Sequence, residues 1–204
     1  MKKVLVTGAG GSIGINVIKY LLSEGKYEIT ALDLRNKNSQ KRLKKYRRRI
    51  NLIYGDMNDS VLMDALVRDH DYIIHLAGIM PPIADIKHNL SEMIDYKGTE
   101  NLIKAINMFN PDAYLFFASS TTIYGKVPKA NCKTKPKLTS LDYYSNTKLK
   151  IEHLIASKVK NYSIIRLPLV LTNPKNGAFM YNVKLNSQVE AITDNDAGYL
   201  FVSA

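Results

Sequence analysis

Short apolar runs alternate with helix-type patterns along most of the chain. Six runs are rich in β-branched and aromatic residues and hold consecutive apolar positions: 3–7, 28–32, 51–55, 71–77, 113–119 and 162–167. Consecutive apolar positions are typical of strands that are covered on both faces, as in a parallel sheet. The pattern therefore predicts six buried strands.

Apolar residues at helical spacing lie between most of these runs. We expect helices along the stripe Val17, Ile18, Leu21 and Leu22, along the stripe Val61, Leu62, Ala65 and Leu66, and over residues 91–109 and 143–159. Gly25 is a C-cap candidate for the first helix, and residues 58–60 offer N-caps for the second. This alternation predicts a doubly wound, mostly parallel α/β sheet with helices on both faces and right-handed crossovers.

The size and composition are those of one globular domain. The chain has 204 residues, of which 46% are apolar and 23% charged, which excludes a wholly disordered protein. No apolar run approaches the roughly 20 residues of a membrane-spanning helix. The apolar stretch after Met1 is too short for a signal peptide, and a single cysteine, Cys132, agrees with a reducing compartment. We therefore expect a cytoplasmic protein without a membrane partner.

A surplus of basic residues gives the chain a formal net charge of +11. The densest block is residues 41–49, which contain one aromatic residue, Tyr46. A nucleic-acid site should also carry stacking aromatics or a known motif spread over a surface, and the sequence shows neither. We expect this block to be a solvated helix or loop at the rim of the domain, with nucleic-acid binding as a minor alternative.

A glycine-rich loop, TGAGGSIG, follows the first strand. Gly8, Gly11 and Gly14 are three residues apart, and the first helix stripe comes next. Glycine permits a tight turn, close approach of the backbone to a pyrophosphate, and packing of the helix on the strand. The backbone N–H groups at the helix start, those of Ser12 and Ile13 among them, are expected to face that anion. The loop predicts a dinucleotide site.

An acidic residue at the end of the second strand supports this interpretation. Asp33 follows Gly14 by about 20 residues, the spacing at which a carboxylate accepts hydrogen bonds from the adenosine ribose hydroxyls. The same carboxylate repels a 2′-phosphate, so Asp33 favours NAD over NADP. Arg35 and Lys37 lie close enough in sequence to keep NADP open as the alternative.

A second candidate site combines a tyrosine, a lysine and a cluster of hydroxyls. Tyr144 and Lys148 are spaced i and i+4, so on a helix they share one face. An ammonium beside a phenol stabilises the phenolate, and we expect it to lower the pKa of Tyr144 towards the working range. A tyrosine of this kind moves the proton of an alcohol or ketone. Residues 119–122 place four hydroxyls where the fifth strand ends, the edge at which ligands bind in doubly wound sheets.

Together these motifs resemble the extended short-chain dehydrogenases/reductases, in their NAD-dependent nucleotide-sugar epimerase/dehydratase branch. The resemblance runs from Lys2 to about Leu171, which is most of the chain. It rests on seven ordered segments: TGAGGSIG (7–14), GDMND (55–59), HLAG (75–78), KGTENL (97–102), SSTTIYG (119–125), YSNTK (144–148) and RLP (166–168). It implies a Rossmann fold, NAD as cofactor and a homodimer formed by the helices near 91–109 and 143–159.

The resemblance also implies the roles of individual residues. Ser120 would bind the substrate oxygen, Tyr144 would move the proton, and Lys148 would tune Tyr144 and hold the nicotinamide ribose. The implied cofactor contacts are Gly8, Gly11, Ser12, Ile13, Gly14, Asp33, Asp56, Met57, Leu76, Ala77, Gly78, Lys148 and Pro168. The implied reaction is hydride transfer at a carbon bearing oxygen, on a nucleotide-sugar. An NAD(P)-dependent ketone or alcohol reductase, or a non-catalytic dinucleotide-binding sensor or subunit, are the alternatives.

Four positions need separate comment. Asp95 stands where the family usually has Asn. Thr121 and Thr122 stand where dehydratases carry an Asp-Glu pair, which argues against dehydration. His75 ends the fourth strand, and without a second ligand at metal-site spacing we expect it to pack structurally and expect no metal site.

The C-terminal part departs most from the family. We expect a dinucleotide-binding domain over 1–171 and a reduced or truncated substrate lobe over 172–204, with a surface loop over 126–141 and irregular chain over 172–194. The apolar run 199–202 stops without a helix-ending signal, so we expect the chain to be cut inside an element, with a last helix that ends raggedly at the surface as the alternative.

Overall fold

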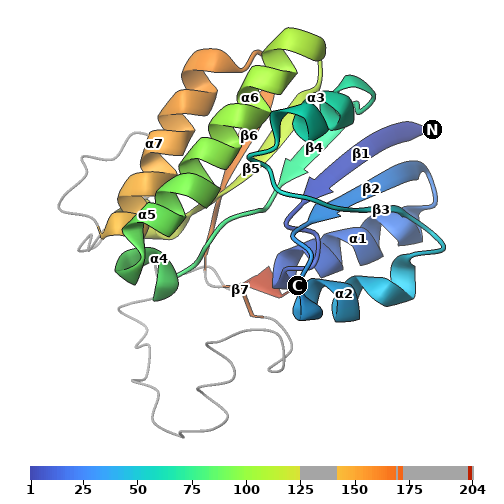
Figure 1. Ribbon diagram of the computed structural model, residues 1–204, viewed down its shortest axis with the longest axis horizontal. Coiled ribbons are helices and arrows are strands. Elements are labelled where there is room, and N and C mark those ends of the chain that lie inside the picture. Colours follow the sequence, from blue (N-terminus) through green and yellow to red (C-terminus); the bar gives the residue numbers. More distant parts are fainter. Residues whose placement is uncertain (125–141, 169, 172–201, 204) are drawn as a thin grey trace, which may run out of the picture.

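A parallel sheet of six strands forms the centre of the protein (Figure 1). The computed structural model describes residues 1–124, 142–168, 170–171 and 202–203. The strand order is β3-β2-β1-β4-β5-β6, and every neighbouring pair is parallel. The strands are β1 (Lys2–Thr7), β2 (Tyr27–Asp33), β3 (Asn51–Tyr54), β4 (Tyr72–His75), β5 (Tyr114–Ser120) and β6 (Tyr162–Leu167). All six predicted strands and the doubly wound fold are confirmed.

Helices cover both faces of this sheet. Figure 1 shows α3, α6 and α7 on one face and α1 and α2 on the other. The helical elements are α1 (Ser12–Glu24), α2 (Lys37–Leu43), η1 (Lys44–Tyr46), α3 (Ser60–Arg68), α4 (Ile83–Ile86), α5 (His88–Ser91), η2 (Glu92–Lys97), α6 (Gly98–Phe109), η3 (Thr121–Tyr124) and α7 (Tyr143–Lys158). The chain adds β2 and β3 outward from β1 on one side, and β5 and β6 outward from β4 on the other. The direction of strand addition therefore reverses between β1 and β4. Such a reversal opens a crevice at the carboxyl ends of the two strands.

Two apolar clusters fill the space between the sheet and its helices. Successive residues of a strand point to opposite faces, and β1 divides accordingly: Val4 and Val6 pack with Ile18 and Leu21 of α1, whereas Leu5 packs in the cluster under α3, α6 and α7. Gly25 ends α1 in the left-handed conformation at φ 67°, as the sequence predicts. The core therefore packs against both faces of the sheet.

The apolar stripe expected along α3 is wrong in part. Leu66 is buried as predicted, but Val61 is 77% exposed and Ala65 is exposed too, and the helix buries Met63 and Val67 in their place. Both sets fit helical spacing, so periodicity alone does not choose between them. The helix begins at an N-cap, Asp59, and packs against α6 from there, which turns the Met63 face inward.

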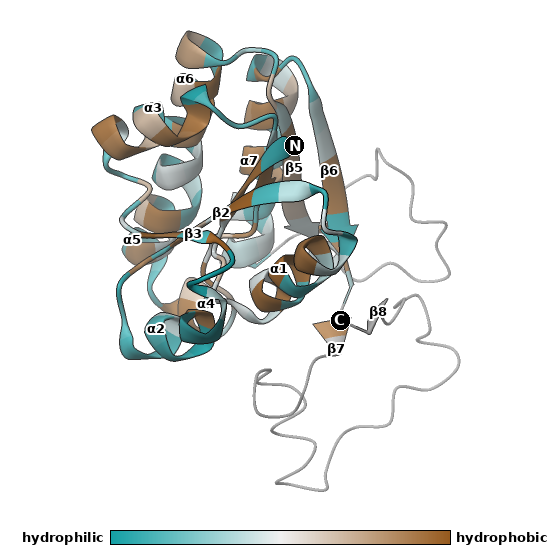
Figure 2. Cartoon of the chain, turned by 90° about the vertical axis from the view of Figure 1, so that its right-hand side faces the viewer, coloured by the Kyte–Doolittle hydropathy of each residue, from teal (hydrophilic) through white to brown (hydrophobic). Residues whose placement is uncertain are grey.

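The basic block between β2 and β3 is helical as far as Tyr46 and continues as a turn on the domain rim, as expected. Two of its residues, Leu43 and Tyr46, are buried and attach it to the core, while most of its Lys and Arg side chains are exposed. Figure 2 shows α2 as a mainly hydrophilic helix. Asn36 caps α2 with its side chain, which accepts from the backbone N–H of Asn38 and Ser39.

Several predictions for the C-terminal part fall outside the described residues. These include the loop at 126–141, the irregular chain at 172–194, most of the run at 199–202, and the division of the chain at residue 171. Two short strands, β7 (Val170–Leu171) and β8 (Val202–Ser203), pair in parallel. In the described ranges, no helix is both long and apolar enough for a bilayer crossing.

Candidate functional site

The glycine loop joins β1 to α1 and packs against the end of β4. Gly8 has φ 64°, and a Cβ on it would lie 2.6 Å from the backbone nitrogen of Ala77. A Cβ on Gly14 would lie 2.5 Å from the carbonyl oxygen of Gly8. Both positions therefore exclude a side chain, and the loop packs closely on the residues that follow β4. α1 starts at Ser12 with no side-chain cap and no acidic residue in its first turn, an arrangement that suits an anion.

Asp33, at the end of β2, is tied to this loop. Its Oδ2 accepts a hydrogen bond of 2.7 Å from the backbone N–H of Gly10. Arg42 Nη1 donates to the carbonyl oxygen of Gly10 at 3.0 Å. Burial raises the pKa of the Asp33 carboxyl, while hydrogen bonds from Gly10 and Leu34 and the charge of Arg42 oppose that rise. The carboxylate is thus held at the rim of the crevice.

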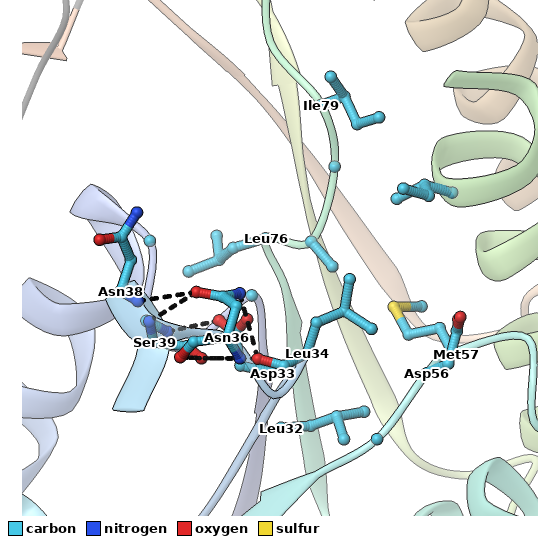
Figure 3. A pocket seen from close by; sticks show the side chains of 17 residues that line it. Leu32, Asp33, Leu34, Asn36, Asn38, Ser39, Asp56, Met57, Leu76 and Ile79 are labelled. Carbon is cyan, nitrogen blue, oxygen red and sulfur yellow. Dashed lines mark hydrogen bonds between the residues drawn. The ribbon is translucent and has the colours of Figure 1, made fainter. Parts of the chain in front are cut away.

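A cavity of about 350 Å³ opens along the carboxyl ends of β1, β2, β3 and β4 (Figure 3). Eight residues that the sequence analysis names line it: Gly8, Gly11, Asp33, Asp56, Met57, Leu76, Ala77 and Gly78. Nine lining residues were missed: Gly10, Leu32, Leu34, Asn36, Asn38, Ser39, Gly55, Ile79 and Ile94. Most of these follow the ends of β2, β3 and β4, so extending each strand-end motif by a few residues would have found them.

Five of the named cofactor contacts lie outside the lining of this cavity. Ser12, Ile13 and Gly14 form the first turn of α1, and Pro168 directly follows β6. Lys148 lies on α7, beyond Gly78. Arg35 and Lys37, which kept NADP open, do not line the cavity either. The Arg35 guanidinium lies 5.2 Å from the centre of the Tyr54 ring.

The hydroxyl cluster at the end of β5 meets the start of α7. The Ser120 side chain accepts hydrogen bonds from the Thr122 hydroxyl at 2.9 Å and from the Thr122 backbone N–H at 3.2 Å. Ser145 Oγ in turn donates to Thr122 Oγ1 at 2.8 Å. Because Ser120 accepts from Thr122 in both bonds, its own O–H proton can be donated to another oxygen.

Tyr144 and Lys148 share the inner face of α7, as predicted, and both are buried. Lys148 Nζ lies 5.6 Å from the centre of the Tyr144 ring and 5.0 Å from that of Phe117. The expectation of a lowered tyrosine pKa is wrong. Burial raises the pKa of Tyr144 to about 12, and the Asp95 carboxylate adds to the rise, whereas a hydrogen bond with Ser120 opposes it. Burial also lowers the pKa of Lys148, against the charge of Asp95.

The start of α7 is held by two carboxylates from different parts of the chain. Asp142, the N-cap, accepts from the Ser145 backbone N–H at 2.7 Å. Asp85 Oδ1, on α4, accepts from the Tyr144 backbone N–H at 2.9 Å. The His88 ring stacks on Tyr143 with centres 3.9 Å apart. The segment 79–91 therefore fixes the position of Tyr144 relative to β4.

His75 lies in a buried hydrogen-bonded chain, in agreement with the structural role expected for it. Its Nε2 lies 2.8 Å from Thr99 Oγ1, and its Nδ1 lies 2.7 Å from Thr7 Oγ1. Thr99 donates its hydroxyl to the Asp95 carbonyl, so Nε2 must carry the proton and Nδ1 must accept from Thr7. Burial, with the nearby charge of Lys148, lowers the pKa of His75 to about 3. In the described ranges, no three His, Cys, Asp or Glu side chains gather as a metal site.

A buried ion pair behind the hydroxyl cluster was missed from the sequence. Arg166, on β6, donates to Glu152 of α7 from Nε at 3.0 Å and from Nη2 at 2.6 Å. Ser119 donates to the same carboxylate, and Arg166 Nη1 donates to the Tyr124 hydroxyl at 3.0 Å. The available signal was spacing: Glu152 follows Lys148 by one helical turn on the buried face.

Comparisons with known proteins agree with this architecture. The sequence profile of the "NAD dependent epimerase/dehydratase family" matches residues 4–182. The UDP-glucose 4-epimerase 3 of Oryza sativa subsp. japonica is 29% identical over 161 residues, covering 74% of this chain and 43% of that protein. The dTDP-glucose 4,6-dehydratase of Mycolicibacterium smegmatis is 30% identical over 171 residues, covering 79% of this chain and 50% of that protein.

Solved structures share the fold at lower identity. A UDP-N-acetylglucosamine 4-epimerase from Methanobrevibacter ruminantium superposes with a TM-score of 0.81 at 20% identity, covering 99% of this chain and 69% of that chain. A UDP-glucose 4-epimerase from Thermus thermophilus, solved with NAD, has a TM-score of 0.73 at 23% identity, covering 83% of this chain and 56% of that chain. The chain thus spans about half the length of the curated relatives it matches.

Proposed function

The chain belongs to the NAD dependent epimerase/dehydratase family, and from that premise we propose that it is the cofactor-binding part of an NAD-dependent nucleotide-sugar epimerase-like oxidoreductase. One observation carries the proposal. The glycine loop, Asp33 and the buried Ser120, Tyr144 and Lys148 all lie at one edge of the sheet.

The residues at this edge fit a dinucleotide. The side-chain-free surfaces of Gly8 and Gly14 and the uncapped start of α1 suit a pyrophosphate, and the Asp33 carboxylate suits vicinal ribose hydroxyls. In this proposal Asp56 and Met57 contact the adenine, Lys148 holds the second ribose and Pro168 borders the nicotinamide. The remaining contacts are Gly8, Gly11, Ser12, Ile13, Gly14, Leu76, Ala77 and Gly78. NAD is preferred because Asp33 lines the cavity while Arg35 and Lys37 do not.

The chemistry proposed for the chain is binding and proton movement. When bound, the nicotinamide supplies the hydride acceptor and donor. Ser120 donates its hydroxyl proton to the substrate oxygen and so fixes the reacting carbon. Tyr144 gives a proton to that oxygen, or removes one, as the carbon is reduced or oxidised. Lys148 supplies positive charge beside the phenol and holds the ribose.

Epimerisation is preferred to dehydration because Thr121 and Thr122 follow Ser120. Loss of water needs groups that transfer further protons, and Thr122 is already engaged with Ser120 and Ser145. UDP-sugars are the preferred substrates, since several of the similar proteins are UDP-sugar epimerases. A ketone or alcohol reductase remains the alternative reaction at the same residues.

A homodimer through α6 and α7 is part of the proposal. These helices lie side by side on one face of the sheet (Figure 1). Met108 of α6 is 73% exposed, and Met93 of the preceding turn η2 is 58% exposed. Light scattering on the purified chain tests this, since a dimer should become a monomer in the Met108→Glu variant. A cytoplasmic location stays a prediction from the sequence.

Calorimetric titration of the chain with NADH and, separately, NADPH is the first test. We expect NADH to bind more tightly. Binding of neither would overturn the proposal for this chain, and preference for NADPH would favour the reductase. With cofactor bound, UDP-glucose, dTDP-glucose and simple carbonyl compounds are then assayed. Tyr144→Phe should abolish turnover while NADH binding survives, and full activity in that variant would remove Tyr144 from the mechanism.

A further inference from the structure

Asp95 is a buried carboxylate that no catalytic role yet involves. It lies on the π-helical turn η2 and is only 1% exposed. Its Oδ1 accepts from the Ile79 backbone N–H at 2.9 Å, and its Oδ2 accepts from the Ser91 hydroxyl at 2.7 Å. Burial raises the pKa of Asp95, but Lys148 and both hydrogen bonds oppose that rise. A charge removed from water in this way requires a compensating partner.

Because Gly78 has no side chain, it leaves room for the Lys148 ammonium to face the Asp95 carboxylate. A Cβ on Gly78 would collide with Asp95 Oδ1 and would lie 3.2 Å from Lys148 Nζ. The carboxylate and the ammonium therefore approach the same empty side of Gly78, one from η2 and the other from α7. Any larger residue at position 78 would come between them.

Tyr144 and Lys148 face titratable groups from several elements of the fold. Lys148 faces the Asp95 carboxylate and the rings of Phe117 and Tyr144, and His75 beside it is neutral. Tyr144 faces Asp95 first, and the carboxylates of Asp142 and Asp85 contribute less. Ser120 is its uncharged partner. Asp95 is thus the carboxylate with the strongest influence on both groups.

We infer that Asp95 is a positioning residue whose charge keeps a proton on both Lys148 and Tyr144, so that the site rests with a phenol ready to donate. The inference rests on the proposed function for its catalytic meaning. Removing a neighbouring negative charge always favours loss of a proton, whichever of the two groups releases it first. Reduction of a carbonyl, in which Tyr144 donates, should therefore be favoured near neutral pH, and oxidation of an alcohol should require higher pH.

Asp95→Asn is a close test because the amide keeps the shape of the side chain. Its oxygen can still accept from Ile79, and its NH₂ can donate to Ser91 with the roles of that bond reversed. The variant thus removes charge and little else. Asp85→Asn is the matched control, since Asp85 also faces Tyr144 but is the weakest of its three carboxylates.

The readout is the pair of proton-loss midpoints of Tyr144 and Lys148, followed by NMR of ¹³C-labelled tyrosine and lysine. Resonances are assigned through the Tyr144→Phe and Lys148→Met variants. The first midpoint is the one at lower pH, whichever of the two side chains it belongs to. We expect Asp95→Asn to lower it, so that the deprotonated fraction of that side chain at a given pH rises about tenfold. Asp85→Asn should shift it far less. Unchanged midpoints in a folded Asp95→Asn chain would overturn the inference.

A second measurement covers the case in which Asp95→Asn does not fold. In Lys148→Met, the midpoint of the Asp95 carboxyl itself should rise, because the coupling between two charges is reciprocal. A midpoint that stays in place overturns the inference equally. All of these midpoints are read without substrate, so a failure to bind NADH would remove the proposed function and leave this result intact.

Discussion

Arg166 Nη2 lies 2.6 Å from Glu152 Oε2 and, with a second bond from Nε, joins β6 to α7 behind the catalytic candidates. Both side chains are largely buried, at 17% and 6% exposure. Ser119 donates to the same carboxylate, so the residue next to Ser120 is held by this pair. The hydrogen bond to Glu152 is the main reason that the pKa of Arg166 is raised. The position of the hydroxyl cluster thus depends on an ion pair that is contributed by two other elements.

Removing one partner of this pair should destabilise the fold. Glu152→Gln leaves the buried guanidinium without its counter-charge, and we expect the free energy of unfolding to fall by about 3 kcal/mol. Urea unfolding of both proteins measures this fall in the free energy of unfolding. The exposed pair Lys160–Asp112 supplies the control, because solvent screens its charges and Asp112→Asn should cost far less stability. Equal losses of unfolding free energy in the two variants would show that the buried pair stabilises the fold no more than the exposed pair does.

Gly14→Ala should abolish cofactor binding. The added methyl would meet the carbonyl oxygens of Gly8 and Ala9 at 2.5 and 2.6 Å, so the loop must move. Titration with NADH measures the loss. Gly25→Ala is the matched control, since it has φ 67° and nothing within 4 Å of a new Cβ. It should cost about 1 kcal/mol of stability from backbone strain and leave NADH binding unchanged. Retained NADH binding in Gly14→Ala would contradict the assignment of the glycine loop as the pyrophosphate site.

Asp33→Ala should reduce the discrimination between NADH and NADPH. Loss of hydrogen bonds from ribose hydroxyls to a charged acceptor should weaken NADH binding by about tenfold or more. NADPH should lose less, because the same substitution removes repulsion of its 2′-phosphate. The ratio of the two dissociation constants is the measurement, and it corrects for any general effect on the loop. An unchanged ratio would mean that Asp33 serves only to bind Gly10.

His75 should make the protein sensitive to acid. Its pKa in the folded chain is about 3, below the ordinary value near 6.5, so the unfolded chain takes up the proton first. The stability contribution is complete above pH ~6.5 and is lost as pH falls from there towards 3, by roughly 1.4 kcal/mol per unit.

Urea unfolding at about pH 7 and pH 5.5 tests this with a His75→Gln variant. The wild-type chain should lose more stability between the two values than the variant does. His70, whose pKa burial also lowers, contributes equally to both proteins and cancels in the comparison. The same acid loss in both would exclude His75 as the cause.

Much of the site was predictable because its signals are local. The glycine loop, Asp33 at the end of β2 and the turn-spaced Tyr144 and Lys148 each follow from short stretches of chain, and the structure brings them to one edge as expected. The buried face of α3 and the anchoring of the basic block were not predictable. Each depends on which of several apolar residues meets a distant partner.

The sequence by itself determined the six strands, the main helices between them, the class of fold and about half of the side chains that line the cavity at the carboxyl edge of the sheet. Periodicity, glycine and residue spacing encode these locally. Only the tertiary structure decided that Asp95 faces Lys148 across Gly78, that Glu152 binds Arg166, and that the pKa of Tyr144 is raised rather than lowered. The energy of a charge depends on its burial and on the charges within a few ångströms, and both are set by chain segments that are far apart in sequence.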